Sequence, residues 1–310
     1  METHKLGWTG FPVSVLGLGT VELGMKYGIG AEAPPPKDEA IALLNYAVEK
    51  GITYIDTARS YGVAEELIGE SGIGEKPGVI IGTKCGAFYE NGEDPRGEEL
   101  ARRLTEEVDA SLRALRRQTI DFLQVYGVSA DIIVRGELME ALKSLKQRGK
   151  VRYFGAATRG EEAPLAVIES KFFQAVQVAV SILDQRMRDR VLAEAFAEGY
   201  GVVARSVFLK GALTPRRDFL PKHLDVLRAR ADAIEEYVTQ QGLTLREAAI
   251  RFVLSIPEVS TLLVGTTKKE HIDEALAHIE KGVLPAPIMG ELGAFRLDDE
   301  QLVDPKLWKL

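Results

Sequence analysis

Short apolar runs alternate with longer amphipathic segments from one end of the chain to the other, and this alternation most constrains the fold. Eight of the runs are rich in β-branched residues and have the length of buried strands. Strands that alternate with helices form parallel sheets, and eight such units predict an α/β fold closed as a (β/α)8 TIM barrel. The predicted strands span residues 14–20, 53–58, 79–84, 120–126, 151–157, 175–180, 201–207 and 261–266.

Predicted helices fill the intervals, and no linker or shift in composition divides the chain, so we predict a single barrel domain over residues 1–310. Residues 1–13 fit poorly as a strand–helix unit and predict an N-terminal β-hairpin that closes the barrel floor. Residues 283–310 contain several prolines and glycines and predict a C-terminal tail with at most one short helix. The predicted helices span residues 37–50, 64–71, 97–117, 134–148, 162–170, 188–198, 222–241, 244–255 and 269–281.

The composition excludes several classes of protein. The 310 residues are 45% hydrophobic and 27% charged, with a net charge of −7, which argues against nucleic acid as the main partner. The single cysteine, Cys85, allows no intrachain disulfide, and the four histidines show no metal-ligand spacing. Neither a signal pattern nor an apolar run of about 20 residues is found. We therefore predict a cytoplasmic protein with a small-molecule substrate, no membrane contact and no metal.

Ionisable residues stand where two consecutive predicted strands end. Asp56 and Tyr61 follow the second strand, and Lys84 ends the third. The carboxyl ends of barrel strands meet on one face, where barrel enzymes hold their active sites. A phenol, an ammonium and a carboxylate can form a proton relay, and we expect the Lys84 ammonium to lower the pKa of Tyr61. This set is suited to protonating a carbonyl oxygen.

The remaining strand ends add polar groups to the same rim. The last strand ends at Gly265 and Thr266, and Lys268 stands where a helix begins, which predicts a phosphate site. Gly17 and Gly19 do not make a Rossmann fingerprint, because Glu22 occupies a position that needs glycine. The other groups at strand ends are Tyr126, Thr158, Gln177, Arg205 and Ser206.

In these segments the chain resembles the aldo-keto reductase family over nearly its whole length. The resemblance implies a (β/α)8 barrel that binds NADPH and reduces aldehydes, ketones or sugar-like substrates by hydride transfer. It implies that Tyr61 is the general acid, tuned by Lys84 and Asp56. The matching motifs are DTARSYGVAEELIG (56–69), GTKCG (82–86), GKVRYFG (149–155), VQV (176–178), ARSVFLKGAL (204–213) and, more loosely, LVGTTKKEHIDEAL (263–276).

The same resemblance assigns cofactor contacts. Gln177 would hold the nicotinamide carboxamide, and Ser206 and Gly211 would lie by the pyrophosphate. The contacts to the adenosine half would come from the last strand and the helix after it, namely Gly265, Thr266, Lys268, His271 and Glu274. NADP is the predicted cofactor, with NAD as the alternative because Thr267 and Ala275 replace two residues that many relatives use there.

Tyr126 is the main departure from the family pattern, because it stands where relatives carry a catalytic histidine. A phenol can donate a hydrogen bond to the substrate oxygen, but it does not become a cation near neutral pH. Tyr126 could replace the histidine as a donor or act as a second acid/base. The third alternative is that the protein binds nucleotide with little turnover. Two further functions thus stay open: a regulatory nucleotide-binding barrel, and a non-redox epimerase or lyase that uses Tyr61 and Tyr126.

Two more departures concern the nicotinamide end. Ala157 and Thr158 replace a Ser-Asn pair, leaving one hydroxyl. Arg205 replaces an aromatic residue that stacks on the nicotinamide ring; a guanidinium can stack as well. Arg205 would favour acidic or phosphorylated substrates, or alternatively pair with an acid such as Asp184. The candidate apolar walls for a substrate are Tyr27, Phe88, Tyr89 and Trp308, and we expect a monomer or a weak homo-oligomer.

Overall fold

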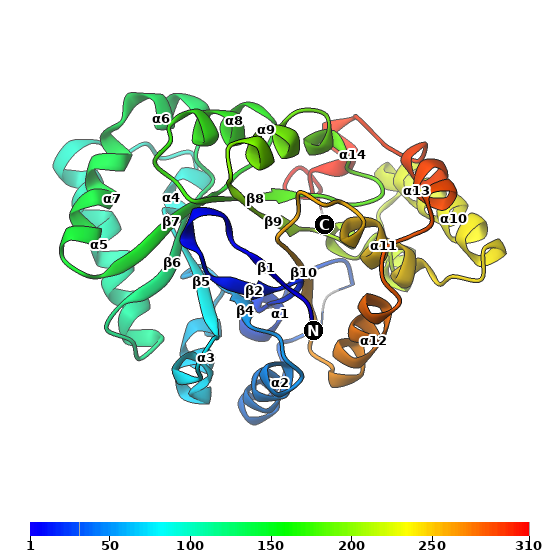
Figure 1. The fold of residues 1–310 in the computed structure, drawn as a ribbon, viewed down its shortest axis with the longest axis horizontal. Coiled ribbons are helices and arrows are strands. Elements are labelled where there is room, and N and C mark those ends of the chain that lie inside the picture. Colours follow the sequence, from blue (N-terminus) through cyan, green and yellow to red (C-terminus); the bar gives the residue numbers. More distant parts are fainter. Residues whose placement is uncertain (31, 310) are drawn as a thin grey trace.

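The computed structural model describes residues 1–30 and 32–309; residue 31, in the predicted rim loop 21–34, and residue 310, at the end of the predicted domain and tail, lie outside the described residues. Eight parallel strands close into a barrel in the order β10-β3-β4-β5-β6-β7-β8-β9, and helices surround it (Figure 1). All eight predicted strands are confirmed, most within one or two residues at each end. They are β3 (Leu16–Gly19), β4 (Tyr54–Asp56), β5 (Ile80–Cys85), β6 (Ile120–Tyr126), β7 (Val151–Ala157), β8 (Ala175–Ala179), β9 (Gly201–Arg205) and β10 (Thr261–Gly265).

The main helices lie where the sequence predicts them, with one addition. The helix predicted over 134–148 begins at Glu137, because Gly136 adopts a left-handed conformation (φ 81°) that ends a further short helix over 130–135, which the sequence does not predict. The helices are α2 (Lys37–Glu49), α3 (Ala64–Ser71), α5 (Gly97–Ala114), α6 (Ala130–Arg135), α7 (Glu137–Gln147), α8 (Glu162–Glu169), α9 (Val191–Ala197), α10 (Asp225–Gln240), α11 (Leu245–Leu254) and α12 (Lys269–Glu280).

The predicted hairpin closes the amino-terminal end of the barrel. Strands β1 (Thr3–Lys5) and β2 (Pro12–Ser14) pair antiparallel. Leu6 packs into the lower barrel with Tyr54 and Phe122. Gly7 comes so close to the start of β9 that a Cβ on it would lie 2.1 Å from the backbone nitrogen of Gly201. The amino-terminal end is therefore sealed, and ligands can enter only from the opposite rim.

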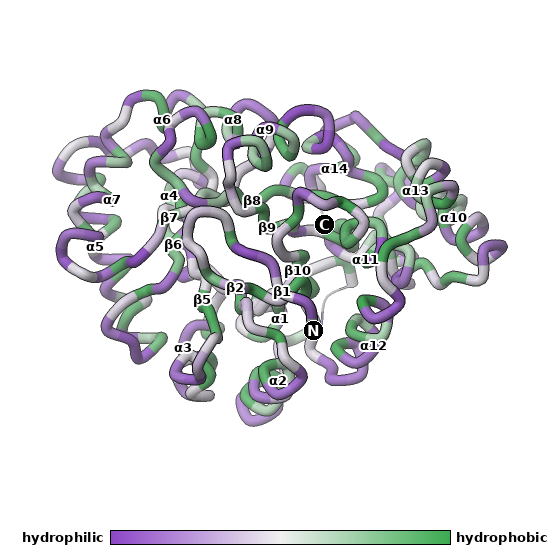
Figure 2. Tube along the Cα trace, viewed as in Figure 1, coloured by the Kyte–Doolittle hydropathy of each residue, from purple (hydrophilic) through white to green (hydrophobic). Residues whose placement is uncertain are grey.

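The strand pleat decides which side chains face the barrel axis. In β4 and β6 every second residue points inward, so an apolar layer of Tyr54 and Phe122 lies below a polar layer of Asp56 and Gln124. Gly82 has no room for a side chain, since its Cβ would lie 2.4 Å from the Tyr54 hydroxyl. The larger core lies between strands and helices, where apolar stretches gather while hydrophilic stretches lie toward the outside (Figure 2). The polar layer sits next to the open rim.

The rim carries more helical structure than the sequence indicates. A short helix α1 (Val21–Gly24) follows β3, and α4 (Ala87–Glu90) lies in the predicted loop 85–97. The tail contains two short helices, α13 (Ala286–Gly293) and α14 (Glu300–Val303), instead of at most one. Asp304 and Lys306 then tie the tail to the rim through Arg159 and Glu90. The tail thus forms part of the wall around the open end.

Candidate active site

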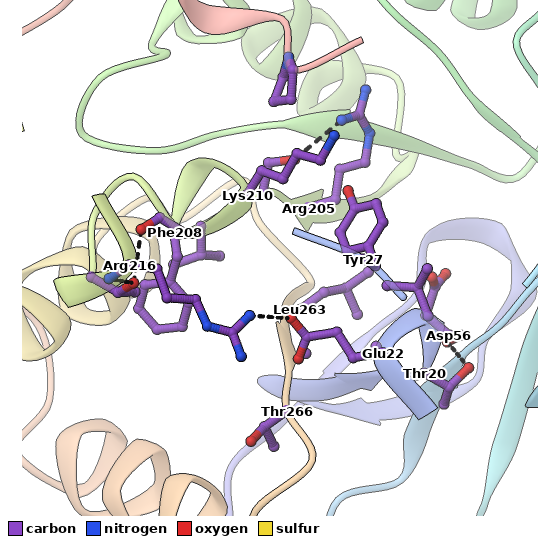
Figure 3. A pocket seen from close by; sticks show the side chains of 18 of the residues that line it. Thr20, Glu22, Tyr27, Asp56, Arg205, Phe208, Lys210, Arg216, Leu263 and Thr266 are labelled. Atoms are coloured by element: carbon purple, nitrogen blue, oxygen red, sulfur yellow. Dashed lines mark hydrogen bonds and ion pairs between the residues drawn. The ribbon is translucent and has the colours of Figure 1, made fainter. Parts of the chain in front are cut away.

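A large cavity of about 620 Å³ opens at the carboxyl ends of the strands. This size lies within the range of ligand-binding pockets. Of the predicted site residues, all except Lys84, Thr158 and Glu274 line it. Figure 3 shows side chains of the β3, β4, β9 and β10 ends converging on this space. The strand ends therefore bring residues that are far apart in sequence to one cavity.

Asp56 and Lys84 form a buried ion pair beneath the cavity floor. Lys84 Nζ lies 2.5 Å from Asp56 Oδ2 and donates a second hydrogen bond to the Thr57 carbonyl at 2.9 Å. The other carboxylate oxygen of Asp56 accepts from Gln177 Nε2 at 2.7 Å and from Gln124 Nε2 at 3.3 Å. Burial lowers the pKa of Lys84, and the Asp56 charge opposes that shift. The carboxylate thus holds the ammonium in one place.

Tyr61 lies over this pair, with Lys84 Nζ 4.9 Å from its ring centroid. Burial and the Asp56 carboxylate raise the pKa of Tyr61 well above its ordinary value. The predicted lowering of this pKa is therefore wrong in net direction, because desolvation and the Asp56 charge disfavour the phenolate and outweigh the attraction of the Lys84 ammonium. The raised pKa keeps the Tyr61 phenol protonated across the neutral range, and a protonated phenol is a hydrogen-bond and proton donor.

Tyr126 ends β6 and lines the same cavity as Tyr61. Its hydroxyl accepts a hydrogen bond from Arg159 Nη2 at 3.4 Å. Arg159 is itself held by Glu90 (3.2 Å) and Asp304 (2.8 Å). Because the guanidinium only donates, the Tyr126 proton remains free to point to another acceptor. A phenol held this way can serve as a second donor in the cavity.

The nicotinamide end predicted from the sequence contains Thr158, Gln177 and Arg205. The Thr158 carbonyl accepts from Arg205 Nη2 at 3.0 Å, while its hydroxyl is buried and has no partner among the described residues. The alternative pairing of Arg205 with Asp184 is wrong, since Asp184 pairs with Arg186 at 2.9 Å. A buried hydroxyl without a partner and the Gln177 amide beside it are groups that a bound carboxamide could satisfy.

The opposite end of the cavity lies where β10 leads into α12. Thr266 Oγ1 is 2.9 Å from His271 Nδ1, and Lys268 begins the helix. Burial lowers the pKa of His271, and the nearby Arg246 reinforces this shift. Glu274 lies behind the wall and pairs with Arg246 at 3.3 Å. A helix N-terminus surrounded by cations suits phosphate groups.

Between the two ends, Ser206 and Gly211 line the cavity on the loop that follows β9, and Gly265 lines it at the end of β10. Gly265 leaves open space, since a Cβ there would come no closer than 3.8 Å to another atom. The cavity thus runs from a proton-donor set to a cationic helix start. An elongated ligand with phosphates at its centre and a polar ring at one end fits this set of donors.

Sequence reasoning missed several residues of this site. Gln124 faces inward from a strand that reads as uniformly buried, and its polar side chain in that position was the available signal. Arg159 directly follows a predicted strand end. Lys210, Arg216 and Arg246 line the cavity from loops and α11, and no spacing in the sequence marks them. Three predicted apolar walls, Phe88, Tyr89 and Trp308, instead pack in the core, and of the four only Tyr27 lines the cavity.

No group of three or more histidine, cysteine, aspartate or glutamate side chains is arranged to hold a metal ion within residues 1–30 and 32–309. Among the helices of the same residues, none is long and apolar enough to cross a membrane.

Comparisons with known proteins agree with this geometry. A sequence model of the Aldo/keto reductase family matches residues 15–295. The chain is 27% identical over 290 residues to the "Uncharacterized oxidoreductase YqkF" of Bacillus subtilis, covering 88% of this chain and 90% of that protein. It is 28% identical over 294 residues to L-galactose dehydrogenase of Arabidopsis thaliana, covering 90% and 88%.

The fold also matches solved structures. The aldo-keto reductase AKR11C1 from Bacillus halodurans, in its holo form, superimposes with a TM-score of 0.79 at 24% identity, over 97% of this chain and 99% of that one. The family match spans most of the chain and includes the strand ends that build the cavity. The chain therefore belongs to the aldo/keto reductase family and is an NAD(P)H-dependent oxidoreductase.

Proposed function

We propose that the protein is an NADP(H)-dependent oxidoreductase of carbonyl and hydroxyl groups, with Tyr61 as the general acid/base. One observation carries the proposal. The buried Asp56–Lys84 pair lies under Tyr61 at one end of a cavity whose other end is a cationic helix start. A donor set and a phosphate site in one cavity are what transfer of hydride from a phosphate-bearing cofactor requires.

In the proposed reduction, Tyr61 donates its proton to the carbonyl oxygen. A reduced nicotinamide held by the cofactor-contact residues would supply the hydride for the carbonyl carbon. The buried Lys84 ammonium stabilises the phenolate left on Tyr61, and Asp56 holds that ammonium in place. Tyr126 donates a second hydrogen bond to the same oxygen, oriented by Arg159. Losing or weakening one such donor typically costs about 10²–10³ in rate, so a phenol in place of histidine is compatible with turnover.

The proposed cofactor contacts follow the cavity from end to end. Gln177 and the Thr158 hydroxyl would hold the carboxamide, and Arg205 would stack on the nicotinamide ring. Ser206 and Gly211 would lie by the pyrophosphate. The adenosine half would be bound by Gly265, Thr266, Lys268, His271 and Glu274. The cations Arg216, Arg246 and Lys268 around His271 favour NADP over NAD, because they suit an additional phosphate group.

The proposed substrates are carbonyl and hydroxyl compounds with polar groups. Polar groups line much of the cavity, including Glu22 and Tyr27, and the likeness to L-galactose dehydrogenase supports sugar-like carbonyl or hydroxyl compounds among the substrates. Glu22 pairs with Arg216 at 3.2 Å across the cavity. We propose a reaction in the cytoplasm by a monomer or weak homo-oligomer.

The test is Tyr61→Phe, assayed for aldehyde reduction and for NADPH binding. Removing the general acid should lower kcat/KM by about 10²–10⁴ and leave the NADPH Kd from fluorescence quenching within about twofold. In the wild type, kcat/KM for reduction should stay level from neutral pH upward and fall only above pH 10. The active form is the protonated phenol, which is present below its raised pKa and lost as pH rises through it.

Two results would contradict the proposal. Equal turnover of Tyr61→Phe and wild type would remove Tyr61 from the chemistry. Tight NADPH binding by the wild type without turnover of any aldehyde, ketone or sugar would instead favour a nucleotide-binding accessory protein.

A further inference from the structure

Two half-buried cations in the cavity form no ion pair with a carboxylate of the described residues. Arg205 and Lys210 both line the cavity and are half-buried, whereas the unpaired cavity cation Lys268 is exposed to solvent. The cavity cations Arg159, Arg216 and Lys306 are paired with carboxylates. Removing a charge from water costs free energy unless the charge is paired. Two half-buried, unpaired cations in one cavity therefore point to an anion that arrives from outside.

The two side chains are oriented toward one region of the cavity. Arg205 donates to two neutral acceptors, the Thr158 carbonyl at 3.0 Å and Ser206 Oγ at 3.2 Å, so it is positioned but not neutralised. Lys210 Nζ lies 5.3 Å from the centroid of the Tyr27 ring. In the view of Figure 3, Arg205 and Lys210 both lie above Tyr27, on the side away from Thr266.

The same region adjoins the reacting groups. Arg205 and Tyr126 both act on the pKa values of Tyr27 and Tyr61, which places the three phenols and the guanidinium in one neighbourhood. Burial and the Arg159 charge lower the pKa of Lys210, while Asp304 opposes this shift. Of the other acids that line the cavity, Glu22 and Glu90 are paired, and Glu32 is exposed and pairs with neither cation.

Backbone strain gives a second, independent observation. Among the described residues, five non-glycine residues have positive φ, and three of them lie within five residues after Arg205: Ser206 (62°), Leu209 (44°) and Lys210 (56°). Glycine would adopt these angles without strain, so a lysine at such a position costs conformational free energy that glycine would not. The strained loop directs the Lys210 ammonium toward the cavity. Strain of this kind clusters at ligand-binding sites.

We propose that Arg205 and Lys210 bind a carboxylate of the substrate, so that the preferred substrates are carbonyl compounds that carry an acid group. This inference rests on the proposed reaction and deepens it. The face of a guanidinium and its N–H edge can serve different neighbours, so Arg205 can stack on a nicotinamide ring and still donate to a carboxylate. The same cations could instead meet the cofactor's diphosphate, and the experiment separates these two sources of anion.

The test compares 4-formylbenzoate with the neutral, nearly isosteric 4-formylbenzamide as substrates. Wild type should show a kcat/KM at least tenfold higher for the acid, since hydrogen bonds to charged groups contribute about that factor or more. Arg205→Gln and Lys210→Gln should each reduce the preference toward one, mainly through KM for the acid, and this loss should exceed any change in the NADPH Kd. Arg205→Lys should restore part of it. Lys222→Gln removes an exposed charge outside the cavity and should change nothing.

Binding is measured in parallel, so that the result does not depend on turnover. Calorimetry of 4-(hydroxymethyl)benzoate and its amide with the protein–NADP⁺ complex should show the same preference for the acid. If no carbonyl is reduced but the acid still binds preferentially through Arg205 and Lys210, the proposed reaction fails and this inference stands. Equal use or binding of acid and amide overturns the inference. Weakened NADPH binding in both variants, with an unchanged preference, assigns the cations to the cofactor and also overturns it.

Discussion

At the scale of single residues, the site is built on the buried ion pair of Asp56 and Lys84, in which both side chains make several hydrogen bonds. Asp56 accepts from Lys84, Gln177 and Gln124, and Lys84 also donates to a backbone carbonyl. Such a pair adds little net stability over an apolar pair, but removing one partner leaves the other buried and unpaired. Its value lies in holding an ammonium at a defined distance from the Tyr61 ring.

We expect Lys84→Met to lower the free energy of unfolding by about 3–5 kcal/mol, because it leaves the Asp56 carboxylate buried without a cation. The double variant Asp56→Asn/Lys84→Met should recover part of that loss. Lys37→Met is the matched control, since Lys37 pairs with Glu70 at the surface and should cost at most about 1 kcal/mol. The measurement is urea unfolding, and equal losses in Lys84→Met and Lys37→Met would refute the account.

At the scale of elements, the junction of β10 and α12 brings a strand end, a helix start and two lysines together. Lys268 lines the cavity, whereas Lys269 turns away and lies 5.2 Å from the centroid of the Tyr46 ring on α2. Adjacent residues at a helix start point in different directions, so only one of the two can reach a ligand. Of the basic residues at this junction, Lys268 and His271 line the cavity and Lys269 does not.

Lys268→Ala should weaken NADPH binding about tenfold and NADH binding by less than threefold, since a charge-assisted contact to an additional phosphate contributes about 1.5 kcal/mol or more. Lys269→Ala should leave both affinities within twofold. Fluorescence titration at two salt concentrations checks this, and the NADPH effect should shrink as salt screens the exposed charge. Equal weakening of NADH in Lys268→Ala would place the lysine against the pyrophosphate instead.

At the scale of the whole molecule, the barrel, the hairpin below it and the tail above it form one connected structure. The hairpin seals the floor through Leu6 and Gly7, and the tail is tied to the rim by Arg159–Asp304 and Glu90–Lys306. The cavity draws its lining from strand ends all around the ring. Binding in the cavity should therefore stabilise the chain as a unit.

We expect one cooperative unfolding transition, with the same midpoint by tryptophan fluorescence and by circular dichroism, as a single domain predicts. NADPH at about 100 times its Kd should raise the free energy of unfolding by about 2.7 kcal/mol. Two transitions, or a shift of only one probe, would show that the hairpin or tail unfolds separately and would contradict the single-domain prediction.

The sequence by itself determined the barrel and the identity of most strand-end residues. Both follow from local regularities: β-branched runs of strand length, and alternation that places Asp56, Lys84 and Gln177 at the carboxyl ends. Where local signals were weak, the predicted ends of helices differ from those in the structure. At Gly136 a left-handed conformation separates α6 from α7, whereas the predicted helix over 134–148 runs through this residue.

Tertiary structure alone decided how those residues act. The direction of the Tyr61 pKa shift depends on desolvation of the phenol and on the charge of the nearby Asp56 carboxylate. Neither burial nor this distance is visible in a motif. The contact between Arg159 and Tyr126 and the approach of Arg246 to His271 join segments from different loops and helices. Such contacts depend on how the chain packs in three dimensions. The spacing of residues in the sequence does not show which charges from distant segments lie close together or how deeply they are buried.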